Sequence, residues 1–164
     1  MAVSATDDLV AHNVRYTAGY AGPLPVVPSR HLTVVTCMDS RMDVHAMLGL
    51  ALGEAHIIRN AGGIVTDDVV RSLAVSQRRL RTRSVVVIHH TDCGLLNLDE
   101  NEFTSELTAA GGAPPPWRVG SFSDVDADVA ACVATLRACP YLVDVTDIRG
   151  FVFEVATGGL REVS

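Results

Sequence analysis

Two short runs of apolar, β-branched residues constrain the fold of this chain most, because each one ends directly in residues of metal-binding type. Residues 34–36 (Val-Val-Thr) lead into Cys37, and residues 85–88 (Val-Val-Val-Ile) lead into His89 and His90. Continuous apolar runs of this length are typical of strands that are buried on both faces of a parallel sheet. Helical patterns alternate with them, so we predict an α/β fold with a mostly parallel central sheet covered by helices on both faces.

The length of 164 residues is that of one domain with a substantial core. We predict an N-terminal helical arm with a proline-rich connector over residues 1–28, and a single α/β domain over residues 29–164. The spacing predicts strands at residues 32–36, 55–59, 85–89 and 151–155, a return strand at 160–163, and helices at 42–48, 67–80, 99–110 and 124–138.

Charge and composition exclude several classes of function. The formal net charge is −6 at pH 7 and all thirteen basic residues are arginine, so nucleic acid is a poor partner. The absence of lysine excludes P-loop and Schiff-base chemistry, because both need its amine. No apolar run is long enough to cross a membrane and the first residues lack the order of a signal peptide, so we expect no membrane association and a cytoplasmic protein.

Candidate metal ligands follow two of the predicted strands. Cys37 and Asp39 come after the first strand, and His90 and Cys93 follow the third. In an open parallel sheet, ligands bind at the carboxyl ends of the strands, so Cys37, His90 and Cys93 converge if these strands are neighbours. Zinc prefers thiolate and imidazole ligands, and catalytic zinc sites keep one position open beside three protein ligands. Water or Asp39 is available for that position.

A closed, purely structural zinc site is the alternative, and it would need Cys132 or Cys139 as a further ligand. Both lie far along the sequence in a predicted helix, and Cys139 directly precedes a proline. The spacing therefore favours the open pattern of a catalytic site. A disulfide framework is not expected from these four cysteines.

The pattern Cys37-x-Asp39-x-Arg41 followed by His90-x-x-Cys93 resembles the signature of the β-class carbonic anhydrases. From about residue 25 onwards the chain is similar to the short archaeal and actinobacterial branch of that family. Two further segments match those of the family: residues 59–62 (Arg-Asn-Ala-Gly) and residues 90–94 (His-Thr-Asp-Cys-Gly).

The resemblance implies a zinc enzyme with one Zn²⁺ per subunit, held by Cys37, His90 and Cys93. It implies carbonate dehydratase activity, in which zinc-bound hydroxide reversibly hydrates carbon dioxide to bicarbonate and a proton. It also implies that Asp39 and Arg41 form a hydrogen-bonded catalytic dyad. Asp39 would bind the zinc only in a closed form of the site, and the forked guanidinium of Arg41 is suited to holding it away.

Other residues near the motifs have more ordinary interpretations. Some family members have a tryptophan where this chain has Val34, and its absence predicts an open site at neutral pH. Gly62 offers a backbone N–H to a small oxyanion substrate, although a tight turn explains it nearly as well. His89 is expected to pack on the opposite face of the sheet, and Asp92 to fix the loop or the tautomer of a ligand.

The resemblance further implies a homodimer, or a higher homo-oligomer, in which the N-terminal arm lies across a second copy. Two other functions stay open beside hydration of carbon dioxide. One is hydrolysis of carbon disulfide or carbonyl sulfide on the same fold, since the fold does not determine the substrate. The other is a non-catalytic zinc-binding regulatory module, whose expected mark is a lost Asp/Arg dyad; this chain retains both residues.

Overall fold

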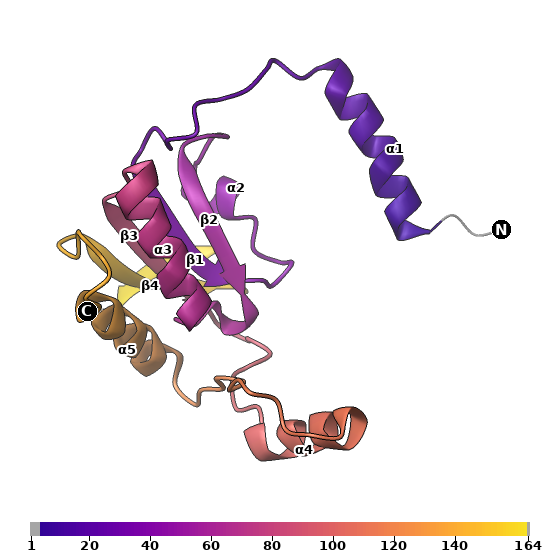
Figure 1. The fold of residues 1–164 in the computed structure, drawn as a ribbon, viewed down its shortest axis with the longest axis vertical. Coiled ribbons are helices and arrows are strands. Elements are labelled where there is room, and N and C mark those ends of the chain that lie inside the picture. The colour runs from indigo at the N-terminus through magenta and orange to yellow at the C-terminus, as the bar shows by residue number, and fades with distance from the viewer. Residues whose placement is uncertain (1–3, 164) are drawn as a thin grey trace.

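The computed structural model describes residues 4–163, and a five-stranded sheet forms its centre (Figure 1). The strands are β1 (Leu32–Cys37), β2 (Ala55–Asn60), β3 (Ser84–His90), β4 (Ile148–Glu154) and β5 (Gly159–Val163). The helices are α1 (Ala5–Ala18), α2 (Val44–Leu48), α3 (Asp67–Leu80), α4 (Glu100–Gly111) and α5 (Val125–Arg137), and a short 3₁₀ turn, η1, spans Ala61–Gly63. The strand order is β2-β1-β3-β4-β5, and only the pairing of β4 with β5 is antiparallel.

The central strands β1 and β3 are buried on both faces, as their continuous apolar runs predict. Val34 and Ile88 lie on one face and Val35 and Val87 on the other, and all four are fully buried. Helices α3 and α5 cover the second of these faces, while α2 and the loops on either side of α4 pack against the first. The predicted fold class, a mostly parallel α/β sheet with helices, is therefore confirmed.

Helix α3 begins where its capping sequence predicts. The hydroxyl of Thr66 accepts a hydrogen bond from the backbone N–H of Val69 at 3.4 Å. Asp67 and Asp68 occupy the first turn, where negative charge is favoured by the helix dipole. Val69 and Leu73 then point from the helix into the core, so local capping and burial select the same boundaries.

Strand β4 starts earlier than predicted, at Ile148 rather than at residue 151. Arg149 and Gly150 separate this isoleucine from the apolar run, and a charged residue followed by glycine is typical of a loop. In the structure Gly150 lies beneath α5, where a side-chain Cβ would collide with Val129. The glycine therefore permits the close approach of a helix to a strand instead of ending the strand.

The N-terminal arm is helical, as predicted, and α1 lies apart from the sheet and the other helices (Figure 1). No described residue of α1 is buried. The arm and its connector expose several large apolar side chains: Leu9, Val10, Val14, Tyr16, Tyr20 and Leu24. The domain boundary at residue 28 stays a prediction. Over residues 4–163 no helix has both the length and the apolar character needed to cross a bilayer.

Two substitutions in α3 test the core that the fold places on its inner side. Leu73 is fully buried against the sheet, whereas Val75 on the same helix is 46% exposed. We expect Leu73→Ala to lower the free energy of unfolding by about 2–5 kcal/mol, because it leaves a cavity. Val75→Ala should change it by no more than about 0.5 kcal/mol. Chemical denaturation of both variants measures this; equal losses would contradict the assigned face.

Candidate functional site

Two neighbouring strands bring the predicted metal ligands together at one edge of the sheet. Cys37 ends β1 and His90 ends β3, and Cys93 lies in the loop that follows. Their ligand atoms lie within 4.8 Å of one another, and all three residues are buried. The convergence expected from the sequence is present, and we call this group the Cys-His-Cys cluster. It lies between β1 and β3, where the chain connections diverge to opposite sides of the sheet, which is the usual ligand position in such folds.

The imidazole of His90 is oriented for a ligand. Its Nδ1 lies 2.9 Å from the backbone oxygen of Thr91, so this nitrogen carries the proton that it donates. The other nitrogen, Nε2, is buried and has no hydrogen-bond partner among the described residues. Histidine ligands of metals commonly donate their second ring N–H to a carbonyl in this way.

The two thiols differ in how readily they ionise. Burial opposes the thiolate of Cys37, but the His90 ring and the backbone N–H groups of Asp39 and Gly62 outweigh it and lower its pKa to about 7. Burial raises the pKa of Cys93. Two thiols, one of them already acidic, and an unpartnered imidazole nitrogen form a donor set that fits zinc.

Asp39 lies beside the cluster and is bound by Arg41. The guanidinium donates from Nε to Oδ1 at 3.0 Å and from Nη2 to Oδ2 at 2.7 Å, and the backbone N–H of Arg41 also donates to Oδ1. These hydrogen bonds hold the pKa of Asp39 far below its usual range. The carboxylate of Asp39 is therefore ionised. Its Oδ2 lies 3.7 Å from Nε2 of His90, so the carboxylate is also directed toward the cluster.

Asp92 fixes the loop that follows β3, one of the two roles expected for it. Its carboxylate accepts from Arg41 Nη1 at 2.6 Å, and its backbone oxygen accepts from Nη2 at 2.8 Å. Asp92 has a left-handed backbone (φ 56°), which matches a tight loop. The tautomer of His90 is set instead by the carbonyl of Thr91. Arg41 therefore joins the loops after β1 and β3.

Arg59 is a structural support of the site that the sequence analysis missed. It is the register partner of Thr36 on the neighbouring strand. Its guanidinium donates to the backbone oxygens of Cys37 at 2.9 Å, Asp39 at 2.6 Å and Met42 at 3.2 Å. One side chain thus fixes the whole turn after β1. Arg59 is the last residue of a predicted strand and the first of the Arg-Asn-Ala-Gly segment, and this position could have indicated its supporting role.

The glycine pair after β2 is required by close packing. Gly63 has φ +73°, and a Cβ there would lie 2.8 Å from the backbone nitrogen of Cys37. Gly62 has φ +77°, and its backbone N–H helps to lower the pKa of Cys37. A tight turn therefore explains both glycines, and contact of Gly62 with substrate stays a prediction.

The remaining candidates lie outside the cluster. His89 points to the opposite face of the sheet, as expected, toward Cys132, and its ring also stacks on Phe122 with centroids 5.5 Å apart. Cys132 is also on that face, and Cys139 joins no group of metal-binding type among the described residues. The alternative closed site with a third or fourth cysteine ligand is thus not formed, and the four cysteines are free thiols.

A small pocket of about 360 Å³ opens beside the Cys-His-Cys cluster. Its polar wall comes from the cluster and Asp39, and the rest is mostly apolar. The lining residues are Cys37, Met38, Asp39, Ala61, Gly62, Cys93, Gly94, Leu95, Leu98, Phe103 and Val119. Such a pocket suits a small, uncharged molecule held close to the thiols and the carboxylate.

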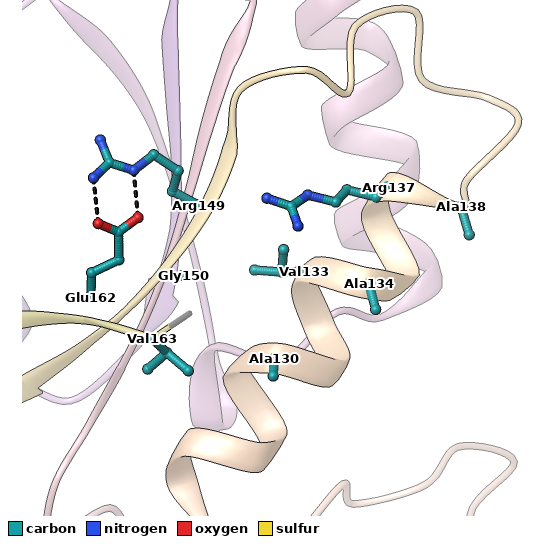
Figure 2. Close-up of a pocket in the computed structure, with 9 residues that line it drawn as sticks. All are labelled: Ala130, Val133, Ala134, Arg137, Ala138, Arg149, Gly150, Glu162 and Val163. Carbon is teal, nitrogen blue, oxygen red and sulfur yellow. Dashed lines mark hydrogen bonds and ion pairs between the residues drawn. The ribbon is translucent and has the colours of Figure 1, made fainter.

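Another pocket lies between α5 and the β4–β5 hairpin, far from these groups (Figure 2). Its most prominent polar feature is an ion pair between Arg149 and Glu162, which engages both carboxylate oxygens. None of its lining residues belongs to the Cys-His-Cys cluster.

Comparison with known proteins identifies relatives of the whole chain. A family model described as carbonic anhydrase matches residues 32–110. β-Carbonic anhydrase 1 of Mycobacterium tuberculosis is 48% identical over 162 residues, which cover 99% of each chain. The crystal structure of a carbonic anhydrase from Streptococcus mutans aligns with a TM-score of 0.92, at 40% identity and 100% coverage of both chains. The chain belongs to the β-carbonic anhydrase family.

The relatives within this group differ in their named substrates. A carbon disulfide hydrolase of Acidianus is 34% identical over 158 residues, covering 82% of this chain and 78% of its own length. The segment matched by the carbonic anhydrase model contains the Cys-His-Cys cluster, Asp39 and Arg41. Membership of the β-carbonic anhydrase family rests on the similarity of the whole chain, and the family model covers the part that builds the site.

Substitution of Gly63 tests whether close backbone approach supports this β-carbonic anhydrase site. Gly63→Ala places a Cβ against the backbone of Cys37, whereas Gly158, also at positive φ (+75°), faces open space. We expect Gly158→Ala to cost about 1 kcal/mol through backbone strain alone. Gly63→Ala should cost at least twice as much and lower the zinc content. Chemical denaturation measures the free energy of unfolding, and metal analysis measures the zinc content. Equal values for the two variants would show that the close approach of Gly63 to Cys37 does not constrain the site.

Proposed function

We propose that this chain is a zinc-dependent carbonate dehydratase, with one catalytic Zn²⁺ per subunit held by Cys37, His90 and Cys93. The observation that carries the proposal is the bidentate Asp39–Arg41 pair, which lies beside an otherwise zinc-like donor set. A purely structural zinc site is closed by four protein ligands and needs no ionised carboxylate beside it. A catalytic site keeps one position open, next to which such a carboxylate can act. Membership of the β-carbonic anhydrase family supports the same activity.

When bound, zinc supplies a Lewis acid that lowers the pKa of a water molecule, from about 15.7 to about 7 in the unrelated carbonic anhydrase that uses three histidines. Asp39 accepts a hydrogen bond from the reacting water and so orients it. The low pKa of Asp39 keeps it an acceptor throughout the neutral range. Arg41 restrains the carboxylate through two hydrogen bonds, so a metal held by the three ligands would keep a position open for water.

The pocket completes the arrangement for carbon dioxide. Leu95, Leu98 and Val119 give it an apolar wall against which an uncharged linear molecule binds without losing hydrogen bonds to water. Asp39 lines the same pocket and is a polar part of its wall. Gly62 lines the pocket as well, and its backbone is proposed to contact the substrate or bicarbonate.

Variants of the dyad and of the ligands separate catalysis from metal binding. Asp39→Ala and Arg41→Ala should keep zinc but lose at least about 10²-fold in turnover, because the water is no longer oriented. Cys37→Ser and His90→Ala should lose the catalytic zinc itself. Stopped-flow hydration of carbon dioxide from about pH 6 to pH 9, with metal analysis of each protein, measures both. Activity should rise with pH through ionisation of water, since Asp39 is ionised over this whole range.

Asp68→Ala is the matched control for the dyad, because it breaks an exposed Asp–Arg pair, with Arg71, of the same 2.7 Å length. Its turnover should equal that of the unmodified protein. Near-normal activity of Asp39→Ala would refute the catalytic role of the dyad.

Hydrolysis of carbon disulfide is the second candidate, and the relationship to the Acidianus enzyme favours it. The same zinc-loaded protein is assayed with both substrates. Turnover of carbon disulfide without hydration of carbon dioxide would replace the proposed activity. Failure with both substrates in a fully loaded protein would favour a non-catalytic zinc module.

A homodimer, or a higher homo-oligomer, is proposed to form through the N-terminal arm. The support is physical: α1 buries none of its described residues against its own domain, yet it carries Leu9, Val10 and Val14 exposed on its surface. An apolar strip of this kind is stabilised by packing against another copy. We expect light scattering to give at least twice the mass of one chain. A monomer that is active and stable would contradict the proposal.

A further inference from the structure

A second group of metal-binding side chains lies on the other face of the sheet from the Cys-His-Cys cluster. It consists of His89 from β3 with Asp128 and Cys132 from α5, and its ligand atoms all lie within 4.8 Å of one another. Asp128 and Cys132 are four residues apart, so the helix presents both on one face, one turn apart. We call these three residues the His-Asp-Cys cluster.

The ring of His89, like that of His90, bonds a backbone carbonyl through one nitrogen and leaves the other without a partner, but the roles of the two nitrogens are exchanged. Nε2 of His89 lies 3.1 Å from the backbone oxygen of Gly63, to which it donates its proton. Its Nδ1 is left as a bare acceptor that is buried and has no hydrogen-bond partner in the described part of the chain. Oδ2 of Asp128, 3.5 Å away, is equally buried and unpartnered. Two buried atoms that face each other without a partner point to a group that belongs between them, and both atoms are of a type that binds a metal cation.

Distance and charge both fit a divalent metal. Bonds of about 2.0–2.3 Å in tetrahedral geometry place ligand atoms about 3.3–3.8 Å apart, which includes the separation of His89 Nδ1 and Asp128 Oδ2. Burial raises the pKa of Asp128, and it raises that of Cys132 to about 11, so neither ionises readily alone. Together, one carboxylate and one thiolate balance the two charges of the cation, and a neutral imidazole adds none.

The cluster is also accessible to an ion. A pocket of about 670 Å³ is lined by Asp128 and Cys132 on one side and by the loop around Trp117 on the other. Asp67, in the first turn of α3, lines the same pocket and favours the entry of a cation. Asp68 lines it as well but is paired with Arg71, and Arg118 adds a positive charge to the lining. Water in this pocket is available for a fourth coordination position.

We propose that His89 Nδ1, the Asp128 carboxylate and the Cys132 thiolate form a second divalent-metal site, suited to Zn²⁺ and distinct from the Cys-His-Cys cluster. On binding, the metal–sulfur bond replaces the S–H bond of Cys132 and the proton passes to solvent. The metal joins α5 to β3 and to the turn at Gly63. It has a structural role in this position, because the dyad and the substrate pocket lie on the other face of the sheet.

Metal stoichiometry of the full chain tests the site. Apoprotein is titrated with Zn²⁺ and, separately, with Co²⁺, and bound metal is counted after gel filtration while the Co²⁺–thiolate charge-transfer band is recorded. We expect two metals per chain in the unmodified protein and one in Cys132→Ser and Asp128→Asn. The Cys132→Ser variant should also lose part of the charge-transfer band. Cys139→Ser is the matched control: this cysteine lies two residues beyond the end of α5 and outside the cluster, and two metals should remain.

The comparison between variants keeps this site separable from the proposed catalytic one. Cys37→Ser should retain one metal, held by the His-Asp-Cys cluster, even if the proposed activity is wrong. Equal metal content in the unmodified protein and in folded Cys132→Ser and Asp128→Asn would overturn the inference, and would assign a shared proton to the His89–Asp128 pair. If circular dichroism shows that those variants do not fold, the metal content of the Cys37→Ser protein tests the second site instead. Absence of bound metal and of the charge-transfer band in that protein would overturn the inference.

Discussion

The parallel pairing of β1 with β3 is the constraint on which the rest of the site depends. It places the last residue of each strand at the same edge of the sheet, so Cys37 and His90 meet. Thr36 and Ile88, which pair in register just before them, are 52 residues apart in the sequence. The side-chain period of a strand is two, so a slip of one residue would exchange His90 for His89. Such a slip would also move Val87 and Ile88 to opposite faces of the sheet. Both side chains are fully buried in close-packed surroundings, so their different shapes oppose the exchange.

Backbone clamps convert this shared edge into a defined geometry. Arg59 holds three carbonyl oxygens of the turn after β1, and Arg41 links that turn to the loop after β3 through Asp39 and Asp92. Arginine suits both tasks because its planar fork bonds several acceptors at once. Gly63 permits a third segment to pack directly on Cys37. Arg59, Arg41 and Gly63 therefore fix the turn after β1 and the loop after β3 through contacts within the protein alone.

Most of the fold and the main cluster could be predicted from the sequence, because their signals are local. Apolar β-branched runs indicated β1 and β3, and ligands placed directly after them had to share an edge once the strands were neighbours. The start of β4 was not predictable, because Arg149 and Gly150 resemble a loop until α5 is known to pack over them. The grouping of His89 with Asp128 depends on how α5 docks on the sheet, which no local pattern specifies.

The two adjacent histidines show how one strand serves both faces of the molecule. His89 and His90 share a peptide bond but point to opposite sides, and each ring donates one N–H to a backbone carbonyl. His89 donates to Gly63, while the neighbouring N–H of Gly62 acts on the thiol of Cys37. The His89 ring therefore supports the turn whose backbone stabilises the Cys37 thiolate. His89, on the face of the sheet away from the pocket, thus contributes indirectly to the low pKa of Cys37 without lining the pocket.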